Sequence, residues 1–153
     1  MRRAVQTRKR VAQARTRARR ASAPRGWAFH KKAGVEILQA SAFAREAWLV
    51  HGFSTRLGGV SRLAKESVLN LGFTEWDTKE VVGKNRAALL ASIGASRMQL
   101  VSLRQIHSDA IHRVDEVPHE PLKGDALISA TPGLVLGVQT ADCVPILLAD
   151  TRT

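Results

Sequence analysis

Short apolar stretches of four to six residues recur along this chain, separated by glycine, proline and polar residues. Runs of this length between turn-forming residues are typical of β-strands. The turn-prone sequence Leu57-Gly58-Gly59 follows one of them. The pattern predicts strands at 35–38, 48–53, 99–103, 110–114, 126–129, 134–139 and 144–149.

One segment has the spacing of an amphipathic helix instead. Asp77 is placed to cap its start, with Glu80 three residues later as in a capping box, and Gly94 marks its end. Its apolar positions and the asparagine between them are Val81, Val82, Asn85, Leu89 and Ile93. Because one helix accompanies many strands, we predict an α+β fold, a layered mixed β-sheet domain with few helices.

Charge divides the chain near residue 32. Residues 1–32 contain twelve Arg or Lys and no Asp or Glu, whereas residues 33–153 contain twelve basic and thirteen acidic residues, a net charge of −1. A run of like charges with little large apolar surface favours disorder. We therefore predict a basic disordered tail at 1–32 and a folded body at 33–153. Such a tail can also bind nucleic acid non-specifically, or be the product of an overextended reading frame.

The cysteine count and the hydropathy of the chain indicate the cellular compartment in which the protein is expected. Cys143 is the only cysteine, so no intrachain disulfide can form, which fits a reducing compartment. No apolar run approaches the roughly 18–20 residues that cross a bilayer. We expect a cytoplasmic protein without membrane partners.

Two side chains have the chemistry of metal ligands. The imidazole of His107 and the thiol of Cys143 form a zinc-type donor pair, although 36 positions separate them. Two donors alone are a weak signal, because free cysteine is usually a buried small hydrophobe and a lone histidine is usually an ordinary polar residue. Only the fold can bring the two together.

A set of motifs in fixed order is more specific. The set comprises His51-Gly52-Phe53-Ser54-Thr55-Arg56, Gly58-Gly59-Val60-Ser61, Leu69-Asn70-Leu71-Gly72, Asn85-Arg86, Gln105-Ile106-His107, Asp125-Ala126-Leu127 and Thr140-Ala141-Asp142-Cys143-Val144-Pro145. In this order and spacing the chain resembles the bacterial laccase-domain family over about residues 48–150. That family was long labelled multicopper polyphenol oxidase and is now regarded as zinc-dependent purine nucleoside phosphorylases.

The resemblance implies a zinc site of two histidines and one cysteine. The family's Gln-x-His histidine falls on His107 and its Thr-Ala-Asp-Cys cysteine on Cys143. The second histidine belongs to a His-Ala-Gly-Trp-Arg-Gly motif that does not occur in this sequence. We therefore expect the N-terminal part of the family fold, truncated at the C-terminus, with weak zinc binding and negligible turnover. An inactive fragment is the alternative.

The implied activity is phosphorolysis of adenosine and inosine, with adenosine deaminase as a side activity. Phosphate needs a cationic donor, and Arg56 is the candidate, with a surface ion pair as the alternative. Asp142 either orients a zinc ligand or ends a strand. Asn70 and Asn85 either line the pocket or serve as turn and helix amides. His51 fits a structural position.

Copper chemistry fits this chain poorly. A multicopper oxidase needs many histidines, commonly in His-x-His pairs. Five histidines, one cysteine and no such pair cannot build a blue-copper site and a trinuclear cluster. Copper is therefore less expected than the zinc that the resemblance implies, and the same resemblance implies purine nucleosides and phosphate as ligands.

Overall fold

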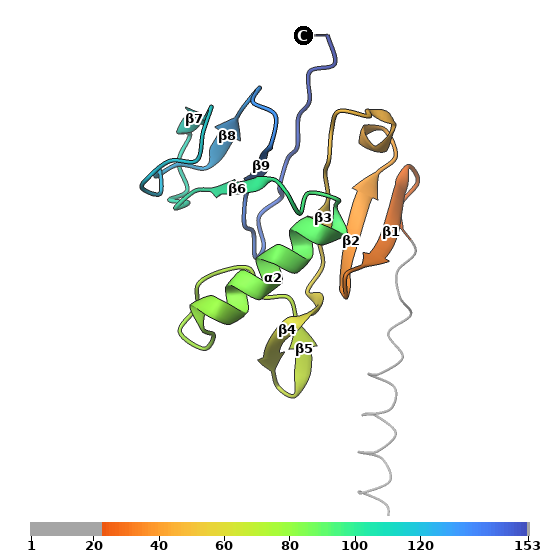
Figure 1. Cartoon of the computed structure of the whole chain (residues 1–153), viewed down its shortest axis with the longest axis vertical. Coiled ribbons are helices and arrows are strands. Elements are labelled where there is room, and N and C mark those ends of the chain that lie inside the picture. Colours follow the sequence, from red (N-terminus) through yellow and green to blue (C-terminus); the bar gives the residue numbers. More distant parts are fainter. Residues whose placement is uncertain (1–22, 153) are drawn as a thin grey trace, which may run out of the picture.

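The computed structural model describes residues 23–152, which form many short strands around one α-helix (Figure 1). The predicted α+β architecture is confirmed. In chain order the elements are β1 (Trp27–Lys32), β2 (Val35–Ala40), the 3-10 turn η1 (Phe43–Arg45), β3 (Phe53–Ser54), β4 (Leu57–Leu63), β5 (Glu66–Val68), α2 (Lys79–Ser92), β6 (Gln99–Ser102), β7 (Ile111–Arg113), β8 (Ala126–Ile128) and β9 (Leu134–Gly137).

An antiparallel sheet of order β1-β2-β3 opens the fold. Its first hairpin pairs Trp27 with Ala40 and Lys32 with Val35. The two-residue turn between them has positive φ at both positions, 52° and 76°, which matches the twist of the strands. The predicted tail boundary at residue 32 is therefore wrong, because the last six residues of that segment pair with β2. Residues 1–22 of the predicted tail lie outside the described residues.

A second hairpin, β4-β5, was missed by the sequence analysis. Leu57-Gly58-Gly59 was predicted to be a turn, but it forms the first part of β4. The register of the β4-β5 pairing shifts between Leu57 and Ser61. Gly59 has φ +76°, and a Cβ there would lie 2.6 Å from Oδ1 of Asn85 on α2. Glycine is thus required for the close approach of β4 to the helix.

The helix α2 lies where its spacing predicted, with its cap shifted by one residue. Thr78, rather than the predicted Asp77, is the N-cap, and its side chain accepts the Val81 N–H at 3.3 Å. Gly94 follows the end of the helix with φ +82°. The helix packs against β2 and β4, and the core cluster consists of Val35, Ile37 and Leu69 with Leu71, Ala88, Leu89 and Ile93.

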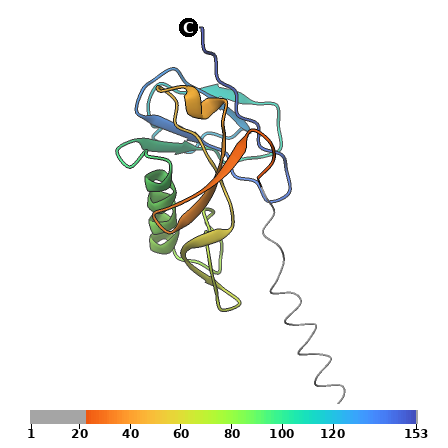
Figure 2. The ribbon, with the colours of Figure 1, turned by 90° about the vertical axis from the view of Figure 1, so that its right-hand side faces the viewer.

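Two parallel strand pairs form the remaining part of the fold, β6 with β9 and β7 with β8. All four strands were predicted, with boundaries within two residues. In the first pair Gln99 lies beside Leu134, and Ser102 lies beside Gly137. The carboxyl ends of β6 and β9 therefore lie side by side. Both views show this part of the fold above α2 (Figure 1 and Figure 2).

Two predicted strands are wrong in whole or in large part. Only Phe53 of the segment 48–53 lies in a strand, because the residues before it form turns and loop. The segment 144–149 has no partner strand within residues 23–152 and runs as an extended trace (Figure 1). Three of its apolar side chains are 73–91% exposed, namely Val144, Ile146 and Leu148. No helix among residues 23–152 has the length and hydrophobicity needed to cross a membrane.

Candidate functional site

The segments that carry His107 and Cys143 leave the same edge of one parallel strand pair. β6 leads into Gln105-Ile106-His107, and β9 leads through Gln139 towards Cys143. The two exits are joined directly, because the backbone N–H of Gln139 donates to Oε1 of Gln105 at 2.7 Å. His107 lies two residues beyond this link and Cys143 four residues beyond it. Carboxyl ends of parallel strands are common locations of ligand sites.

A third motif meets the same edge. The Leu71 carbonyl accepts the side-chain N–H of Gln139 at 2.8 Å and Nε of Arg86 at 2.9 Å. The Arg86 guanidinium also lies over the Phe73 ring, 4.6 Å from its centroid. Burial lowers the pKa of Arg86, although a guanidinium remains charged at neutral pH. The Asn70-Leu71-Gly72 motif and α2 are thus tied to the strand exit that leads to Cys143.

His107 is exposed and has an unusual backbone conformation. Its φ is +57°, a region that non-glycine residues rarely adopt. Its backbone N–H donates to Oδ1 of Asp125 at 3.1 Å. The Ser108 backbone N–H, with the Ile106 and His107 N–H groups, holds the pKa of Asp125 below its usual range, because these donors favour the carboxylate form.

Cys143 is exposed, and its thiol lies 3.9 Å from Oδ1 of Asp142. Within residues 23–152 no hydrogen bond joins the thiol to the His107 imidazole. The same residues contain no group of three or more His, Cys, Asp or Glu side chains that could hold a metal ion. The structure therefore brings the two loops to one edge but does not assemble a closed set of ligands.

Arg56 lies between β3 and the β4-β5 hairpin in the chain. Its Nη1 is 3.6 Å from Oε2 of Glu66, and the two side chains are 73% and 67% exposed. An ion pair this exposed is weak, about 0–1 kcal/mol. The guanidinium is thus accessible to an anion, and its role in phosphate binding stays a prediction.

The side chains of Asn70 and Asn85 form hydrogen bonds within the protein. Asn85 is fully buried; its Oδ1 accepts the Val60 N–H, while its Nδ2 donates to Ser61 Oγ and the Asn70 carbonyl. The Asn70 amide donates to Asp77 at 2.9 Å. The Ser61 hydroxyl and the Asn70 amide lower the pKa of Asp77. These contacts join β4, the Leu69–Gly72 loop and α2, and substrate contacts by either asparagine stay predictions.

His51 has the structural position that the sequence indicated. It is buried, its Nε2 accepts the Ala40 N–H at 2.9 Å, and its ring packs edge-on against Phe43. Burial lowers its pKa. His51 therefore fastens the end of β2 and is not a ligand candidate.

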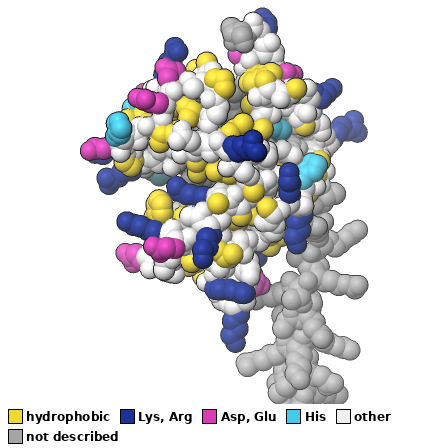
Figure 3. Space-filling model, viewed as in Figure 1, with side chains coloured by type: hydrophobic (Ala, Val, Ile, Leu, Met, Phe, Trp, Pro, Cys, Tyr) yellow, Lys and Arg dark blue, Asp and Glu magenta, His cyan; other side chains and the backbone are white. Residues whose placement is uncertain are grey.

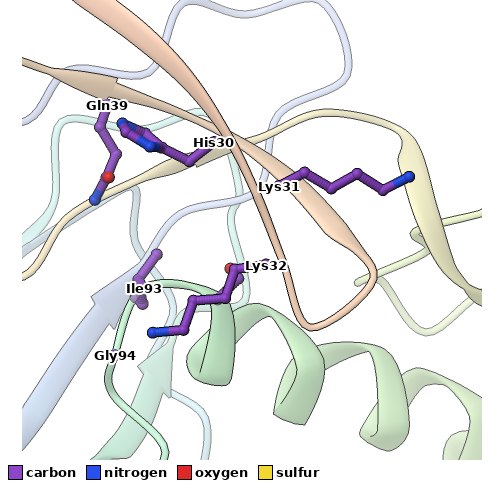
Figure 4. A pocket seen from close by; sticks show the side chains of 7 residues that line it. His30, Lys31, Lys32, Gln39, Ile93 and Gly94 are labelled. Atoms are coloured by element: carbon purple, nitrogen blue, oxygen red, sulfur yellow. The ribbon is translucent and has the colours of Figure 1, made fainter.

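The hollow shown in Figure 4 contains none of the predicted site residues. It has a volume of about 410 Å³ and is lined by His30, Lys31, Lys32, Gln39, Ser92, Ile93 and Gly94. In Figure 4 Lys32 extends towards Ile93 and Gly94, at the end of α2, whereas Lys31 points away. Only the segments that carry His107 and Cys143 leave the β6–β9 edge, where Gln105 and Gln139 are linked.

Comparison with known proteins connects these motifs to one family. The model of the family described as multi-copper polyphenol oxidoreductase laccase matches residues 50–153. The chain belongs to this family. The matched region begins one residue before His51 and includes both strand exits and Cys143, so it contains every predicted site residue of the described fold.

Relatives of this chain are named purine nucleoside phosphorylases. That of Mycobacterium tuberculosis is 43% identical over 100 residues, 65% of this chain and 40% of the relative. That of Deinococcus radiodurans is 38% identical over 117 residues, 76% and 43% of the two chains. YfiH of Escherichia coli is 39% identical over 97 residues, 63% and 39%. The chain thus spans about 40% of the length of these curated relatives.

A solved structure supports the fold. The Neisseria meningitidis protein NMB0706, assigned to the family DUF152, matches with a TM-score of 0.51 and 28% sequence identity. The match covers 78% of this chain and 43% of that chain. The described fold therefore corresponds to part of a known family structure.

Three residues near the β6–β9 edge were assigned no role from the sequence alone. Gln139 links the two strand exits, Arg86 binds the Leu71 carbonyl, and Asp125 holds the His107 loop. Arg86 and Asp125 already stood inside the motifs that carry the family resemblance. Their hydrogen-bond partners could not be predicted from the sequence, because each contact spans 15 or more positions and depends on the tertiary fold.

Proposed function

We propose that this protein acts as a zinc-dependent purine nucleoside phosphorylase. The observation that carries the proposal is the convergence of the Gln105-Ile106-His107 and Asp142-Cys143 segments at one strand edge. The names of the relatives give the reaction class. The substrates are then a purine nucleoside and inorganic phosphate. Phosphate replaces the purine on the ribose, which yields the free base and ribose 1-phosphate.

His107 and Cys143 are the zinc ligands in this proposal. Imidazole nitrogen and thiolate sulfur match zinc in kind. Catalytic zinc usually has three protein ligands, so this pair supplies two of three. The scarcity of histidines argues against a multicopper centre. When bound, zinc would supply Lewis acidity to the substrate.

The remaining residues bind and orient. Arg56 is the candidate phosphate ligand, because an exposed guanidinium matches phosphate oxygens in geometry and charge. Asp142, 3.9 Å from the thiol, is placed to orient Cys143. Asn70 and Asn85 support the site indirectly, by holding the Leu71 loop against α2. Adenosine deamination is the proposed side activity.

We further propose a cytoplasmic location, from the single cysteine. Nucleic acid is expected to bind only non-specifically, through the basic segment 1–32. On the face shown in Figure 3, Lys and Arg side chains alternate with acidic and apolar ones and form no continuous basic stripe. A specific nucleic-acid surface usually has such a stripe.

The test is the release of adenine from adenosine by the 153-residue chain with zinc added in excess. We expect release only slightly above background, and this release should require both zinc and phosphate. His107→Ala and Cys143→Ala should abolish it and remove bound zinc. His119→Ala is the matched control, because His119 is exposed and outside the motifs, and it should retain both properties.

Different products separate the possible outcomes. Inosine formed without phosphate would identify deamination as the main activity. No adenine release from the wild-type chain would overturn the proposal for this chain and favour the inactive fragment. Zinc binding that survives both single substitutions would show that His107 and Cys143 are not the ligands.

A further inference from the structure

One carboxylate organises the loop that carries His107. Asp125 accepts the backbone N–H groups of three successive residues: Ile106 at 3.3 Å, His107 at 3.1 Å and Ser108 at 2.7 Å. It also accepts the Ser108 hydroxyl at 3.0 Å. A carboxylate is an acceptor only. Here Oδ2 accepts three of the four contacts and Oδ1 accepts the fourth, from the His107 N–H.

Strand pairing explains why Asp125 reaches this loop. β7 and β8 are parallel, with Ile111 beside Ala126. The residue before β8 is therefore held next to the residue before β7, and the Asp125 N–H donates to the Ala110 carbonyl at 3.1 Å. This fixes the backbone of Asp125 independently of its side chain. Its carboxylate then faces residues 106–108.

The contacts compensate for an unfavourable backbone. A left-handed conformation costs a non-glycine residue about 1–2 kcal/mol, and His107 has φ +57°. Hydrogen bonds to a charged acceptor are stronger than neutral ones. The carboxylate therefore selects a loop conformation that this sequence would otherwise populate poorly. That conformation sets the direction in which the His107 imidazole leaves the β6–β9 edge.

We propose that Asp125 is a positioning residue for the metal ligand His107. The inference rests on the proposed function, because it assigns a purpose to the loop geometry of a zinc ligand. Asp125 acts through the backbone of residues 106–108 and touches neither substrate nor metal. Loss of its carboxylate should therefore weaken zinc binding while both ligands are retained.

The experiment compares Asp125→Asn with Asp109→Asn. Both remove one charge from the same region, but Asp109 is exposed and has no hydrogen bond or ion pair within residues 23–152. An amide presents one acceptor oxygen and an NH₂ group that cannot accept, so it cannot satisfy all four donors. Hydrogen exchange of the amides at 106–108, zinc affinity and the thermal midpoint are measured for each.

We expect Asp125→Asn to speed exchange at 106–108 by about tenfold and to weaken zinc binding by about 10–100-fold. Asp109→Asn should match the wild type in both. Measuring zinc affinity well below the thermal midpoint removes any contribution from global unfolding. Asp125→Glu, which retains the carboxylate, should recover part of the affinity.

Two results would overturn the inference while leaving the proposed function standing. Unchanged exchange in Asp125→Asn would show that the carboxylate does not fix the loop. Faster exchange with unchanged zinc affinity would show that the loop geometry does not serve the metal. A wild-type chain that binds no zinc would instead defeat the proposed function, and with it the metal-positioning role, whereas the exchange data would still report the loop anchor separately.

Discussion

Substitution of Asn85 tests whether this motif residue holds the fold or binds substrate. In Asn85→Ala the Val60 N–H and the Asn70 carbonyl lose their partners at 2.8 Å, whereas Ser61 keeps its bond to Asp77. Each unsatisfied buried group costs about 1–3 kcal/mol. With some relief from water, we expect a loss of about 2–4 kcal/mol, a large part of the roughly 5–15 kcal/mol typical of a domain.

Asn85→Asp sharpens the test, because it preserves shape. One oxygen can still accept the Val60 N–H, but the other replaces a donor and faces the Asn70 carbonyl. It also buries a charge without a cation, so the loss should reach about 3 kcal/mol or more. Burial should raise the pKa of the introduced carboxyl. The deficit should therefore shrink as pH falls, because protonation restores a donor.

Equilibrium urea unfolding, followed by tryptophan fluorescence and circular dichroism, measures these differences. Lys84→Ala, at an exposed neighbouring helix position, is the control and should change the free energy of unfolding by under about 0.5 kcal/mol. Wild-type stability in both Asn85 variants would refute the structural reasoning. If such a variant also lost nucleoside turnover, Asn85 would belong to the substrate site.

Three further predictions test separate parts of the molecule. Gly83→Ala should raise the free energy of unfolding by about 1 kcal/mol, because Gly83 lies inside α2 with open space around its Cα. Gly59→Ala should lower it, because φ is +76° and the new Cβ would lie 2.6 Å from Asn85. Equal thermal shifts in the two variants would contradict this. Burial lowers the pKa of His51 below the ordinary histidine value of about 6.5. Below about pH 6.5 the unfolded chain therefore binds more protons, and stability is lost as pH falls. His51→Gln, which retains an acceptor for Ala40, should flatten the pH dependence of urea unfolding, and an unchanged slope would contradict this. Arg56→Ala should raise the KM for phosphate by about tenfold or more, because a charge-assisted hydrogen bond is lost. The thermal midpoint should not change, because the ion pair of Arg56 with Glu66 is exposed. An unchanged KM would remove Arg56 from the site.

Local patterns were sufficient for the elements whose stability is local. Periodicity and end signals located α2, because helical hydrogen bonds and caps join residues within one turn. Apolar runs located β6 to β9 to within two residues. The ordered motifs indicate the family from sequence alone, because each motif is contiguous. The sequence by itself therefore determined the fold class, the family and the candidate ligands His107 and Cys143.

Pairing was decided only by the tertiary structure, because a strand needs a partner that its own sequence does not name. The β1 segment ends in two lysines and was predicted to belong to the basic tail, yet it pairs with β2 along its full length. The segment 144–149 is strongly apolar, yet it forms no strand within residues 23–152, where it has no neighbour to pair with. The links Gln105–Gln139 and Asp125–His107 span 34 and 18 positions. They exist because parallel pairing brings distant strand ends together, and they hold the segments around His107 and Gln139 in place.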